Sequence, residues 1–349
     1  MKIRGMGLAL PSHQVSNDDV LEMIASSNHG LSPKAEKKYL KMTRKLLRFS
    51  GTETRYWLAD DERPVDLLRG AVDEALAEAG LEHRQVDLVI YAAVSRGFLE
   101  PAESFALSKS AGLDPADCFD VLEACNSFSR AVEIAQFYLD AGRADNALVV
   151  VGEFCVNGSS FVKATFAPRT LGELGWRLPS YTLGEAAAAI LLEPSDDAWN
   201  FRCHTDASLA DACVVAFPWG ADYGPELIEG PHQAEQFRSF GQRMHAAALP
   251  ATLQMWEEFE AEVPEKIDEA ALMITHTPSR TLAERFCEEA GFPYEKLYSV
   301  YSRYGNVGSA SIPMGLYMAR QEGRLRREDQ VLCLVGAAGM SFMLYDFVF

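Results

Sequence analysis

The stretch Cys118–Phe154, CFDVLEACNSFSRAVEIAQFYLDAGRADNALVVVGEF, places a strand, a helix and a second strand in direct succession. Its outer segments, Cys118–Ala124 and Ala147–Phe154, are apolar runs of strand length. Such runs are typical of strands that are covered on both faces. The segment between them has the pattern of a helix and ends at Gly142, a residue type that often terminates helices. This unit predicts an α/β architecture with helices on both faces of a mostly parallel sheet.

The same alternation of strands and helices continues through the rest of the chain. Further strands are predicted in the N-terminal segment MKIRGMGLALPSHQ and at Val86–Ala93, Ala186–Leu192, Ala271–Thr275, Gln330–Val335 and Ser341–Phe349. Helices are predicted after the capping residue Ser16, and from Pro64 to Ala79, where Gly80 ends the helix.

A polar segment, SDDAWN after Pro194, divides this pattern into two halves, residues 1–194 and 195–349. The two halves have a similar α/β rhythm, as in a duplicated domain. In the second half, a helical stretch from His232 to Val263 contains Pro250, which predicts a kink or a break.

Composition narrows the class of protein. The 349 residues carry a formal net charge of −18, from 32 Lys and Arg against 50 Asp and Glu, which argues against binding to nucleic acid or to an anionic membrane. The apolar runs are far shorter than the roughly 18 residues of a membrane span. Seven cysteines without a CxxC spacing argue against a disulfide framework and a zinc site. We therefore expect a cytoplasmic protein with no metal site.

One segment has the opposite charge to the rest of the chain. Lys34–Arg48 contains seven basic residues and the single acid Glu36. This pattern fits either a solvated face of an amphipathic helix or a docking patch for phosphate groups or an acidic carrier protein.

Cys125 is the first candidate for chemistry, because it lies on the predicted turn between a strand and the N-terminus of a helix. Unpaired N–H groups and the helix dipole at such a turn favour a thiolate, and the backbone amides can donate to an oxyanion. A cysteine in an α/β core is more often an inert small hydrophobe, and we interpret the other six cysteines in that way.

His276 and Asn306 are the other candidates. His276 follows an apolar strand at its carboxyl end, where ligands of open α/β sheets bind. His204 is the second choice among the histidines; His13, His29, His83, His232 and His245 lie in predicted loops or polar helical stretches and are set aside. Asn306 lies between Gly305 and Gly308 in a loop that can turn tightly, although a Gly- and Ser-rich loop before a helix could also cradle phosphate.

These motifs resemble those of the type III ketoacyl synthases of the thiolase superfamily. The run DVLEACNSFSRAVEIAQFYLDAGRADNALVVVGE is similar to the nucleophile segment, THTPSR takes the place of the histidine motif, and YGNVGSASIP is similar to the asparagine motif. The segments IRGMGLALPSHQVSNDD and SGTETRYW also resemble the N-terminal region of this family.

The resemblance implies a duplicated thiolase fold with α-β-α-β-α layers, usually a homodimer, and a triad of Cys125, His276 and Asn306. Cys125 would accept an acyl group from a thioester of coenzyme A or of acyl carrier protein. His276 and Asn306 would bind the carbonyl of a malonyl-type thioester during decarboxylation. The amides of Cys125 and Ala338 would form an oxyanion hole. The coenzyme or phosphopantetheine would be part of the substrates, so the family needs no separate cofactor.

The chain also departs from the family pattern. Lys45 stands where the family has an adenine-stacking tryptophan, Glu100 precedes Pro101 where a phenylalanine is frequent, and GEAAAA replaces the glycine-rich GDGAGA string. These departures indicate a specialised relative, as in secondary metabolism, with carrier-bound substrates. Residues assigned to substrate or carrier binding are Lys45, Arg48, Glu100, Arg280, Gly305 and Gly308.

Three alternatives to decarboxylative condensation remain open. The acyl group on Cys125 could pass to an oxygen or nitrogen nucleophile, which would need no carbanion. A hydroxymethylglutaryl-synthase type of condensation would need a carboxylate base, for which Glu100 is the candidate. A non-catalytic partner subunit would not need the triad at all.

Overall fold

The computed structural model describes residues 1–157, 162–217, 220–224 and 237–349. Within these ranges the chain forms two five-stranded sheets and two small two-stranded ones. The first sheet has the order β1 (Lys2–Ala9), β7 (Ala186–Glu193), β6 (Ala147–Glu153), β4 (Leu88–Ala92) and β5 (Asp117–Val121). The second sheet has the order β12 (Leu297–Tyr298), β11 (Ala270–His276), β13 (Gln330–Ala337), β14 (Ser341–Val348) and β8 (Asn200–Thr205).

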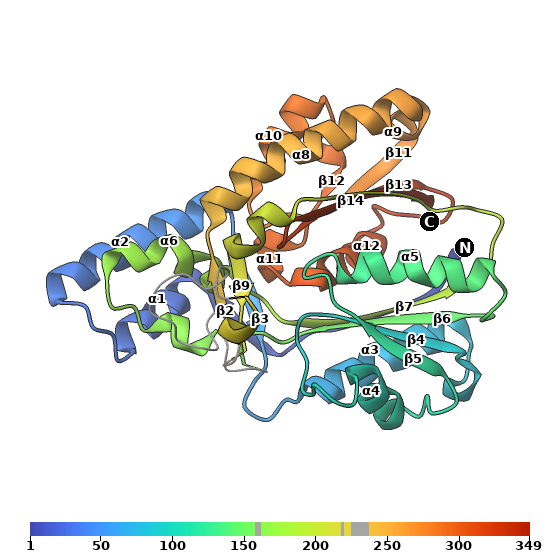
Figure 1. Ribbon diagram of the computed structural model, residues 1–349, viewed down its shortest axis with the longest axis horizontal. Helices are drawn as coiled ribbons and strands as arrows, with labels where there is room; N and C mark the ends of the chain where they lie inside the picture. Colours follow the sequence, from blue (N-terminus) through green and yellow to red (C-terminus); the bar gives the residue numbers. More distant parts are fainter. Residues whose placement is uncertain (158–161, 218–219, 225–236) are drawn as a thin grey trace.

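Helices cover both sheets and separate them, as Figure 1 shows. The central layer holds α5 (Ser127–Asp140) and α12 (Ser311–Gln321), which lie between the two sheets. The outer layer on the first sheet holds α3 (Pro64–Ala79) and α4 (Glu103–Ala111); the one on the second sheet holds α8 (Gly241–Glu262), α9 (Pro264–Glu269) and α10 (Arg280–Ala290). The layers therefore alternate α-β-α-β-α, as predicted.

The remaining elements pack at one end of these layers (Figure 1). They are α1 (Asn17–Ser26), α2 (Pro33–Ser50), β2 (His13–Ser16), β3 (Thr54–Trp57), α6 (Leu174–Arg177), α7 (Gly220–Tyr223), β9 (Cys213–Val215), β10 (Phe237–Ser239) and α11 (Tyr301–Tyr304). The side chain of Ser16 caps α1, and Gly80 ends α3 with a φ of +63°, so both predicted helix boundaries are confirmed.

Both large sheets are mixed. In the first, β4 pairs in parallel with β5 and β6, whereas β7 pairs antiparallel with β1 and β6. In the second, β11 pairs in parallel with β12 and β13, and β14 pairs antiparallel with β13 and β8. Burial is nearly complete along β4, β6 and β7, which explains their continuous apolar sequences.

The break predicted at Pro250 does not occur, whereas the kink stays a prediction. Residues Gly241–Glu262 form one helix, α8, with Pro250 inside it, while the predicted start at His232 lies outside the described residues. Two residues later, the Thr252 hydroxyl donates to the carbonyls of Ala248 and Leu249, at 2.8 and 3.0 Å. These bonds do not replace the one that Pro250 cannot donate to the Ala246 carbonyl, so the packing of the buried face, which includes Leu249, Met255 and Phe259, keeps the helix continuous.

Candidate active site

The turn that carries Cys125 lies between the end of β5 at Val121 and the start of α5 at Ser127. Ala124, directly before the cysteine, has a φ of +48°, in the left-handed region. The Ser127 hydroxyl donates to the carbonyl of Ala124 at 2.7 Å and accepts from the amide of Glu123 at 2.9 Å. Ser127, at the start of α5, therefore holds Glu123 and Ala124 in place, and Ala124 keeps the strained backbone conformation that directly precedes Cys125.

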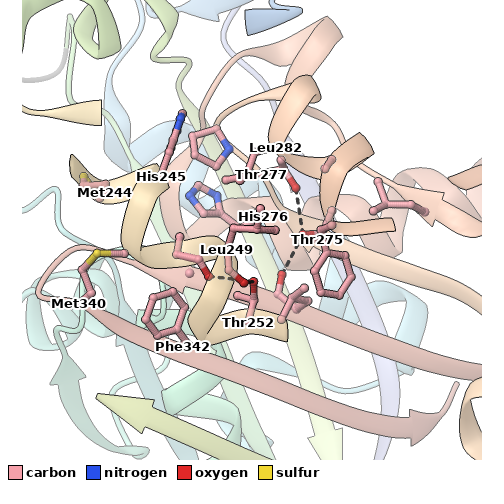
Figure 2. A pocket seen from close by; sticks show the side chains of 17 residues that line it. Met244, His245, Leu249, Thr252, Thr275, His276, Thr277, Leu282, Met340 and Phe342 are labelled. Carbon is pink, nitrogen blue, oxygen red and sulfur yellow. Dashed lines mark hydrogen bonds between the residues drawn. The ribbon is translucent and has the colours of Figure 1, made fainter. Parts of the chain in front are cut away.

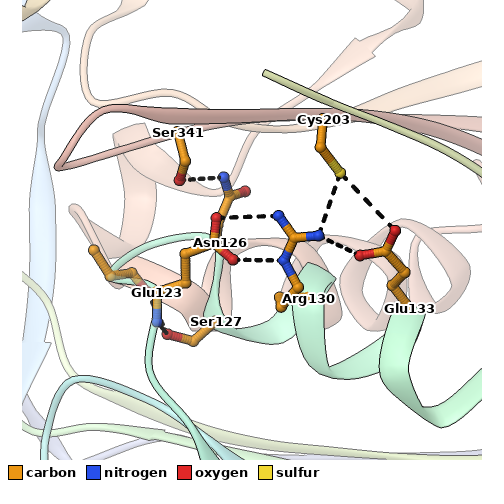
Figure 3. A network of polar contacts seen from close by, with 8 residues as sticks. Glu123, Asn126, Ser127, Arg130, Glu133, Cys203 and Ser341 are labelled. Atoms are coloured by element: carbon orange, nitrogen blue, oxygen red, sulfur yellow. Dashed lines mark hydrogen bonds and ion pairs between the residues drawn. The ribbon is translucent and has the colours of Figure 1, made fainter. Parts of the chain in front are cut away.

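A polar network extends this support to the second half of the chain (Figure 3). The guanidinium of Arg130 on α5 pairs with the Glu123 carboxylate at 2.7 Å and with Glu133. Next to Cys125, the carboxamide of Asn126 donates to the Ser341 hydroxyl at 2.9 Å. Ser341 begins β14, so contacts from both halves fix the nucleophile turn.

Burial raises the pKa of the Cys125 thiol, and the nearby Glu153 carboxylate and Cys213 raise this pKa further. The expectation that the helix N-terminus holds the sulfur as a thiolate is therefore wrong. Loss of solvation and a nearby negative charge outweigh the favourable amide dipoles. The resting residue is a thiol that needs a base to react.

Glu153, at the end of β6, is a buried carboxylate that the sequence analysis did not identify. It accepts hydrogen bonds from the amides of Val94 and Ser309 at 3.2 and 3.4 Å, and from the Ser309 hydroxyl at 2.7 Å. Its other oxygen accepts from the amide and hydroxyl of Ser95, at 3.4 and 3.2 Å. Burial raises the pKa of Glu153, and these donors act against that rise. The carboxylate thus ties the end of β4 to the loop of Asn306.

His276 ends β11 and is buried, as predicted for a residue at the carboxyl end of a strand. Burial lowers its pKa to about 4, so the imidazole is neutral at physiological pH. Its Nδ1 lies 2.9 Å from the Ser311 hydroxyl, which donates to the Gly308 carbonyl at 2.8 Å. When the Ser311 hydroxyl donates to the Gly308 carbonyl, the ring proton of His276 lies on Nδ1, and Nε2 is free to accept a proton. When the Ser311 hydroxyl instead donates to Nδ1, the ring proton lies on Nε2, which is then a donor.

Asn306 lies between the end of α11 and the start of α12. The backbone of Asn306 bonds to Thr182 and Gly184, at 2.7 and 2.9 Å. Its side-chain Oδ1 accepts from the amide of Gly308 at 2.9 Å, so the Nδ2 group is left as the donor of this carboxamide.

Both glycines of this loop are needed for close approach of the chain to itself. Gly305 has a φ of +73°, and a Cβ there would lie 2.5 Å from the Thr182 carbonyl oxygen. Gly308 has a φ of +53°, and a Cβ there would lie 3.1 Å from Glu153. These contacts account for both glycines as parts of the loop framework; a direct substrate contact stays a prediction.

A continuous set of contacts links the segments that carry the three candidates. His276 connects through Ser311 to Gly308, and Gly308 connects to Asn306. The Glu153 carboxylate contacts this loop and acts electrostatically on Cys125. Ala338 lies in the half-buried turn between β13 and β14, three residues before the partner of Asn126. The structure therefore brings the three motifs and the predicted oxyanion residue to one region where the halves meet.

A pocket of about 80 Å³ adjoins His276 (Figure 2). Residues of α8, α10, the end of β11 and the β13–β14 hairpin line it, and most of them are apolar. His245, which the sequence analysis set aside, lines the same pocket, and burial lowers its pKa. The sequence signal for His245 was weak because it lies on a helix rather than at the end of a strand.

The other residues that the sequence analysis proposed for substrate binding or catalysis lie mostly at the surface. Lys45 and Arg48 are exposed on α2, and Arg280 begins α10. Helices α2 and α10 are in contact, because the Thr281 hydroxyl on α10 donates to the Phe49 carbonyl on α2 at 3.2 Å. Arg280 therefore lies beside α2. Glu100 is exposed in the connection from β4 to α4. His204, the second-choice histidine, is exposed on β8.

Within the described ranges, none of the helices is long and apolar enough to cross a membrane. The described residues also include no group of three or more His, Cys, Asp and Glu that could hold a metal ion.

Comparison with known families identifies two matching segments. Residues 119–207 match 3-oxoacyl-[acyl-carrier-protein] synthase III, and residues 262–344 match the C-terminal part of the same family. The first segment contains Cys125, and the second contains His276 and Asn306.

Individual relatives match over nearly the whole chain. The beta-ketoacyl-[acyl-carrier-protein] synthases III of Clostridium perfringens (strain SM101) and Symbiobacterium thermophilum are 26% and 27% identical. The alignments cover 97% of this chain in both cases, and 95% and 97% of the relatives.

Solved structures show the same fold. The 3-oxoacyl-[acyl-carrier-protein] synthase III of Aquifex aeolicus has a TM-score of 0.79 at 22% identity, covering 100% of this chain and 99% of the other. OleA of Xanthomonas campestris, solved with lauric acid and lauroyl-CoA, has a TM-score of 0.84 at 21% identity, covering 99% and 98%. The chain described here is ketoacyl synthase III-like in its family segments and its relatives, and it has the fold that these solved condensing enzymes share.

Proposed function

We propose that this enzyme transfers an acyl group from a thioester to Cys125 and then joins it to a malonyl-type thioester by decarboxylative Claisen condensation. The observation that carries the proposal is the hydrogen-bonded path from His276 through Ser311 and Gly308 to Asn306. This path leaves the Nδ2 group of Asn306 as a hydrogen-bond donor, and it lets Nε2 of His276 act either as a donor or as an acceptor. Two such groups at one carbonyl stabilise an enolate.

In the first step, Nε2 of neutral His276 accepts the Cys125 proton, and the sulfur attacks the thioester carbonyl. The carbon–sulfur bond of the donor breaks, and its thiol leaves with the proton. The raised pKa of Cys125 and the lowered pKa of His276 make this proton transfer part of the reaction rather than a property of the resting enzyme.

In the second step, the malonyl-type thioester loses CO2, and the electron pair of the broken bond forms an enolate. Asn306 and the Nε2–H form of His276 bind the enolate oxygen. The α-carbon then attacks the acyl group on Cys125, a carbon–carbon bond forms, and the thiolate leaves and takes up a proton. Coenzyme A or phosphopantetheine takes part only as a portion of the substrates.

Intact-mass measurement after incubation with a panel of acyl thioesters tests the first step. We expect the wild-type protein to gain the mass of one acyl group and Cys125→Ala to gain none. Cys203→Ala is the matched control, because Cys203 is an exposed thiol on β8. An equal mass gain in Cys125→Ala would remove this residue from the mechanism.

Acyl transfer to an oxygen or nitrogen nucleophile is the second candidate function. It needs Cys125 and a base, but it needs no group for an enolate. The Gly308 amide orients the Asn306 carboxamide as a donor, which favours condensation. A hydroxymethylglutaryl-synthase type of reaction would draw its base from Glu100. A non-catalytic partner subunit would show no acylation in the same mass measurement.

We also propose that the acyl donors or acceptors arrive on acyl carrier protein. All seven basic residues of α2 are exposed, while the rest of the chain is strongly acidic. Lys45 and Arg48 lie on the part of this helix that meets Arg280, four residues after His276. Such a cationic surface fits the phosphate of phosphopantetheine and an acidic carrier.

The first half of the chain carries a further surface that supports a homodimer. Strand β5 is an edge strand, and near it Phe98, Leu99, Phe105 and Leu122 are each 49–64% exposed. Exposed apolar groups beside an open strand edge favour pairing with a second copy. Sedimentation analysis of Leu122→Lys tests this proposal, with a monomer as the expected result.

Three smaller proposals complete the assignment. All seven cysteines are free, which fits a reducing compartment such as the cytoplasm. The connection between β7 and β8 is the proposed boundary between duplicated halves, residues 1–194 and 195–349. The departures from the family motifs support a specialised role, as in secondary metabolism.

A further inference from the structure

Asn126, the residue after Cys125, has a side-chain contact that the chemistry above does not use. It stands at the N-cap position of α5, where an asparagine usually accepts a hydrogen bond from an amide of the first helical turn. Here its φ and ψ are −85° and −4°, in the helical region, and its side chain makes no capping bond. The carboxamide instead donates to the Ser341 hydroxyl at 2.9 Å, away from its own helix, as Figure 3 shows.

Fold stability does not account for this asparagine. Its side chain is fully buried, and its Oδ1 atom has no hydrogen-bond partner among the described residues. A buried acceptor without a partner destabilises a fold, whereas an alanine at this position would avoid that cost. The Nδ2 contact with Ser341 is therefore the feature of Asn126 that a function must explain.

The contact joins the two segments that carry the proposed oxyanion hole. Asn126 directly follows Cys125, whose amide is one of the two donors. Ser341 pairs with Ala337 at the end of the β13–β14 hairpin, and Ala338, whose amide is the second donor, directly follows Ala337. The bond between Asn126 and Ser341 therefore lies next to both donors in the sequence and in the hairpin register.

Each of the two segments is fixed within its own half of the chain by other contacts. The Ser127 hydroxyl holds the turn before Cys125. Met340 and Asp206 exchange two backbone hydrogen bonds of 2.8 Å, which hold the turn of the hairpin beside the end of β8. These contacts set each amide relative to its own sheet, but not relative to the other amide.

An oxyanion hole depends on the distance between its two donors. Both N–H groups must lie about 2.7–3.1 Å from the same oxygen. A displacement of about 1 Å can slow a reaction by about 10²-fold. Because the donors proposed here come from different halves of the chain, a contact between the halves must set their separation. The Asn126–Ser341 bond is such a contact.

We propose that Asn126 is a positioning residue: its hydrogen bond to Ser341 fixes the amide of Cys125 relative to the amide of Ala338. This inference rests on the proposed function, because it takes these amides as the oxyanion hole for acyl transfer. When the Cys125 sulfur attacks the thioester carbonyl, an electron pair of the C=O bond moves to the oxygen, which both amides bind. The pair returns as the carbon–sulfur bond of the donor breaks, and the donor thiol leaves with the proton from Cys125. Asn126 takes no part in these bond changes.

Two reactions of the same sulfur test this role. Acylation by a thioester places charge on an oxygen, whereas alkylation by iodoacetamide displaces iodide from a CH2 group and needs no oxyanion hole. In Asn126→Ala, we expect the rate of acylation to fall by about 10²-fold, while the rate of alkylation at the same pH stays that of the wild type. Quenched-flow mass measurement with acetyl-, hexanoyl- and lauroyl-CoA follows acylation. Mass measurement of the peptide that contains Cys125 follows alkylation.

Ser129→Ala is the matched control. The Ser129 hydroxyl also links α5 to β14, through a 3.3 Å contact with the Tyr345 hydroxyl, and both residues are buried. This contact lies one helical turn beyond Cys125, away from the two amides, so both rates should equal those of the wild type.

Variants of the acceptor complete the test. Ser341→Ala should cause the same loss of acylation as Asn126→Ala, and the double variant should cause no further loss. Ser341→Thr keeps a hydroxyl on a strand residue and should keep fast acylation. Ser341→Ala also provides the same comparison of the two rates if Asn126→Ala does not fold.

The outcomes separate this inference from the proposed function. Unchanged acylation in Asn126→Ala, or equal losses of acylation and alkylation, would overturn the inference, because the variant would then have no effect or a general effect on the Cys125 turn. Additive losses in the double variant would also overturn it. A wild-type protein that is alkylated at Cys125 but gains no acyl mass would instead overturn the proposed function.

Discussion

The surroundings of Cys125 and those of His276 differ in how they hold a reactive group. Charged and polar groups surround the cysteine: Glu153 acts on its sulfur, and the Glu123–Arg130 pair and the Asn126–Ser341 bond fix its turn. The histidine lies beside an apolar pocket, and its Nδ1 contacts the neutral hydroxyl of Ser311.

This difference has a chemical consequence. The cysteine must be held rigidly while its charge changes, and a polar network with defined geometry does so. The histidine must stay neutral at physiological pH and accept or donate a proton as needed, which burial in an apolar region favours. Under the proposed mechanism, polar groups mainly from the first half of the chain hold the cysteine, and apolar groups from the second half surround the histidine.

The largest effect that would test this division comes from Asn306→Ala. We expect acyl loading of Cys125 to survive, while decarboxylation of the malonyl-type thioester falls by about 10²–10³, because one of two donors at the enolate oxygen is lost. Mass measurement follows loading and CO2 release follows decarboxylation. Equal losses in both steps would show that Asn306 is a structural amide.

Acid should destabilise the histidine side of the site. The folded pKa of His276 is about 4, against 6.5 for the free side chain, so only the unfolded chain binds this proton between these values. The contribution of His276 to the free energy of unfolding is therefore fully present above pH 6.5 and falls by about 3 kcal/mol as the pH drops to 4. Denaturant unfolding at several pH values measures it, and His276→Gln should lose this part of the pH dependence. An unchanged dependence in the variant would contradict the neutral, buried state.

Glu153→Gln should affect both regions in opposite ways. The amide places a donor against the Ser309 and Val94 amides, which should slow decarboxylation by about tenfold or more through the Asn306 loop. Removal of the negative charge should also lower the pKa of Cys125. Iodoacetamide labelling of Cys125 as a function of pH should therefore shift to lower pH. A shift to higher pH would contradict the assigned role of the Glu153 charge.

The smallest effect concerns the Glu123–Arg130 pair. Arg130→Met should slow acylation of Cys125 by about tenfold, because the turn loses one of its supports. Arg285→Met is the matched control: it breaks an exposed pair with Glu289 on α10, which contributes little. Stopped-flow acylation kinetics compare the two variants. Equal rates would show that Ser127 and Asn126 hold the turn without the ion pair.

Much of the fold could be predicted because apolar runs report burial directly. Strand β6 begins at Ala147 as predicted and ends at Glu153, one residue before the predicted end. The nucleophile turn was also predictable, since a strand and a helix follow each other at Cys125. Pro250 was misleading because tertiary packing kept α8 intact despite the missing N–H.

The electrostatics of the site could not be predicted in the same way. The helix N-terminus at Cys125 is visible in sequence, but the desolvation that overrides it depends on how deeply the turn packs. Glu153 is visible only as an acid at the end of an apolar strand, and its partners on the Ser309 loop lie 156 residues away. His245 approaches His276 only after α8 packs on the second sheet.

The β13–β14 hairpin links the pocket beside His276 to the turn that carries Cys125. Gly336, just before its turn, borders the pocket, and Ser341, just after the turn, accepts the hydrogen bond of Asn126 beside Cys125. A substitution that shifts this hairpin at the pocket will therefore also move the anchor of the Cys125 turn.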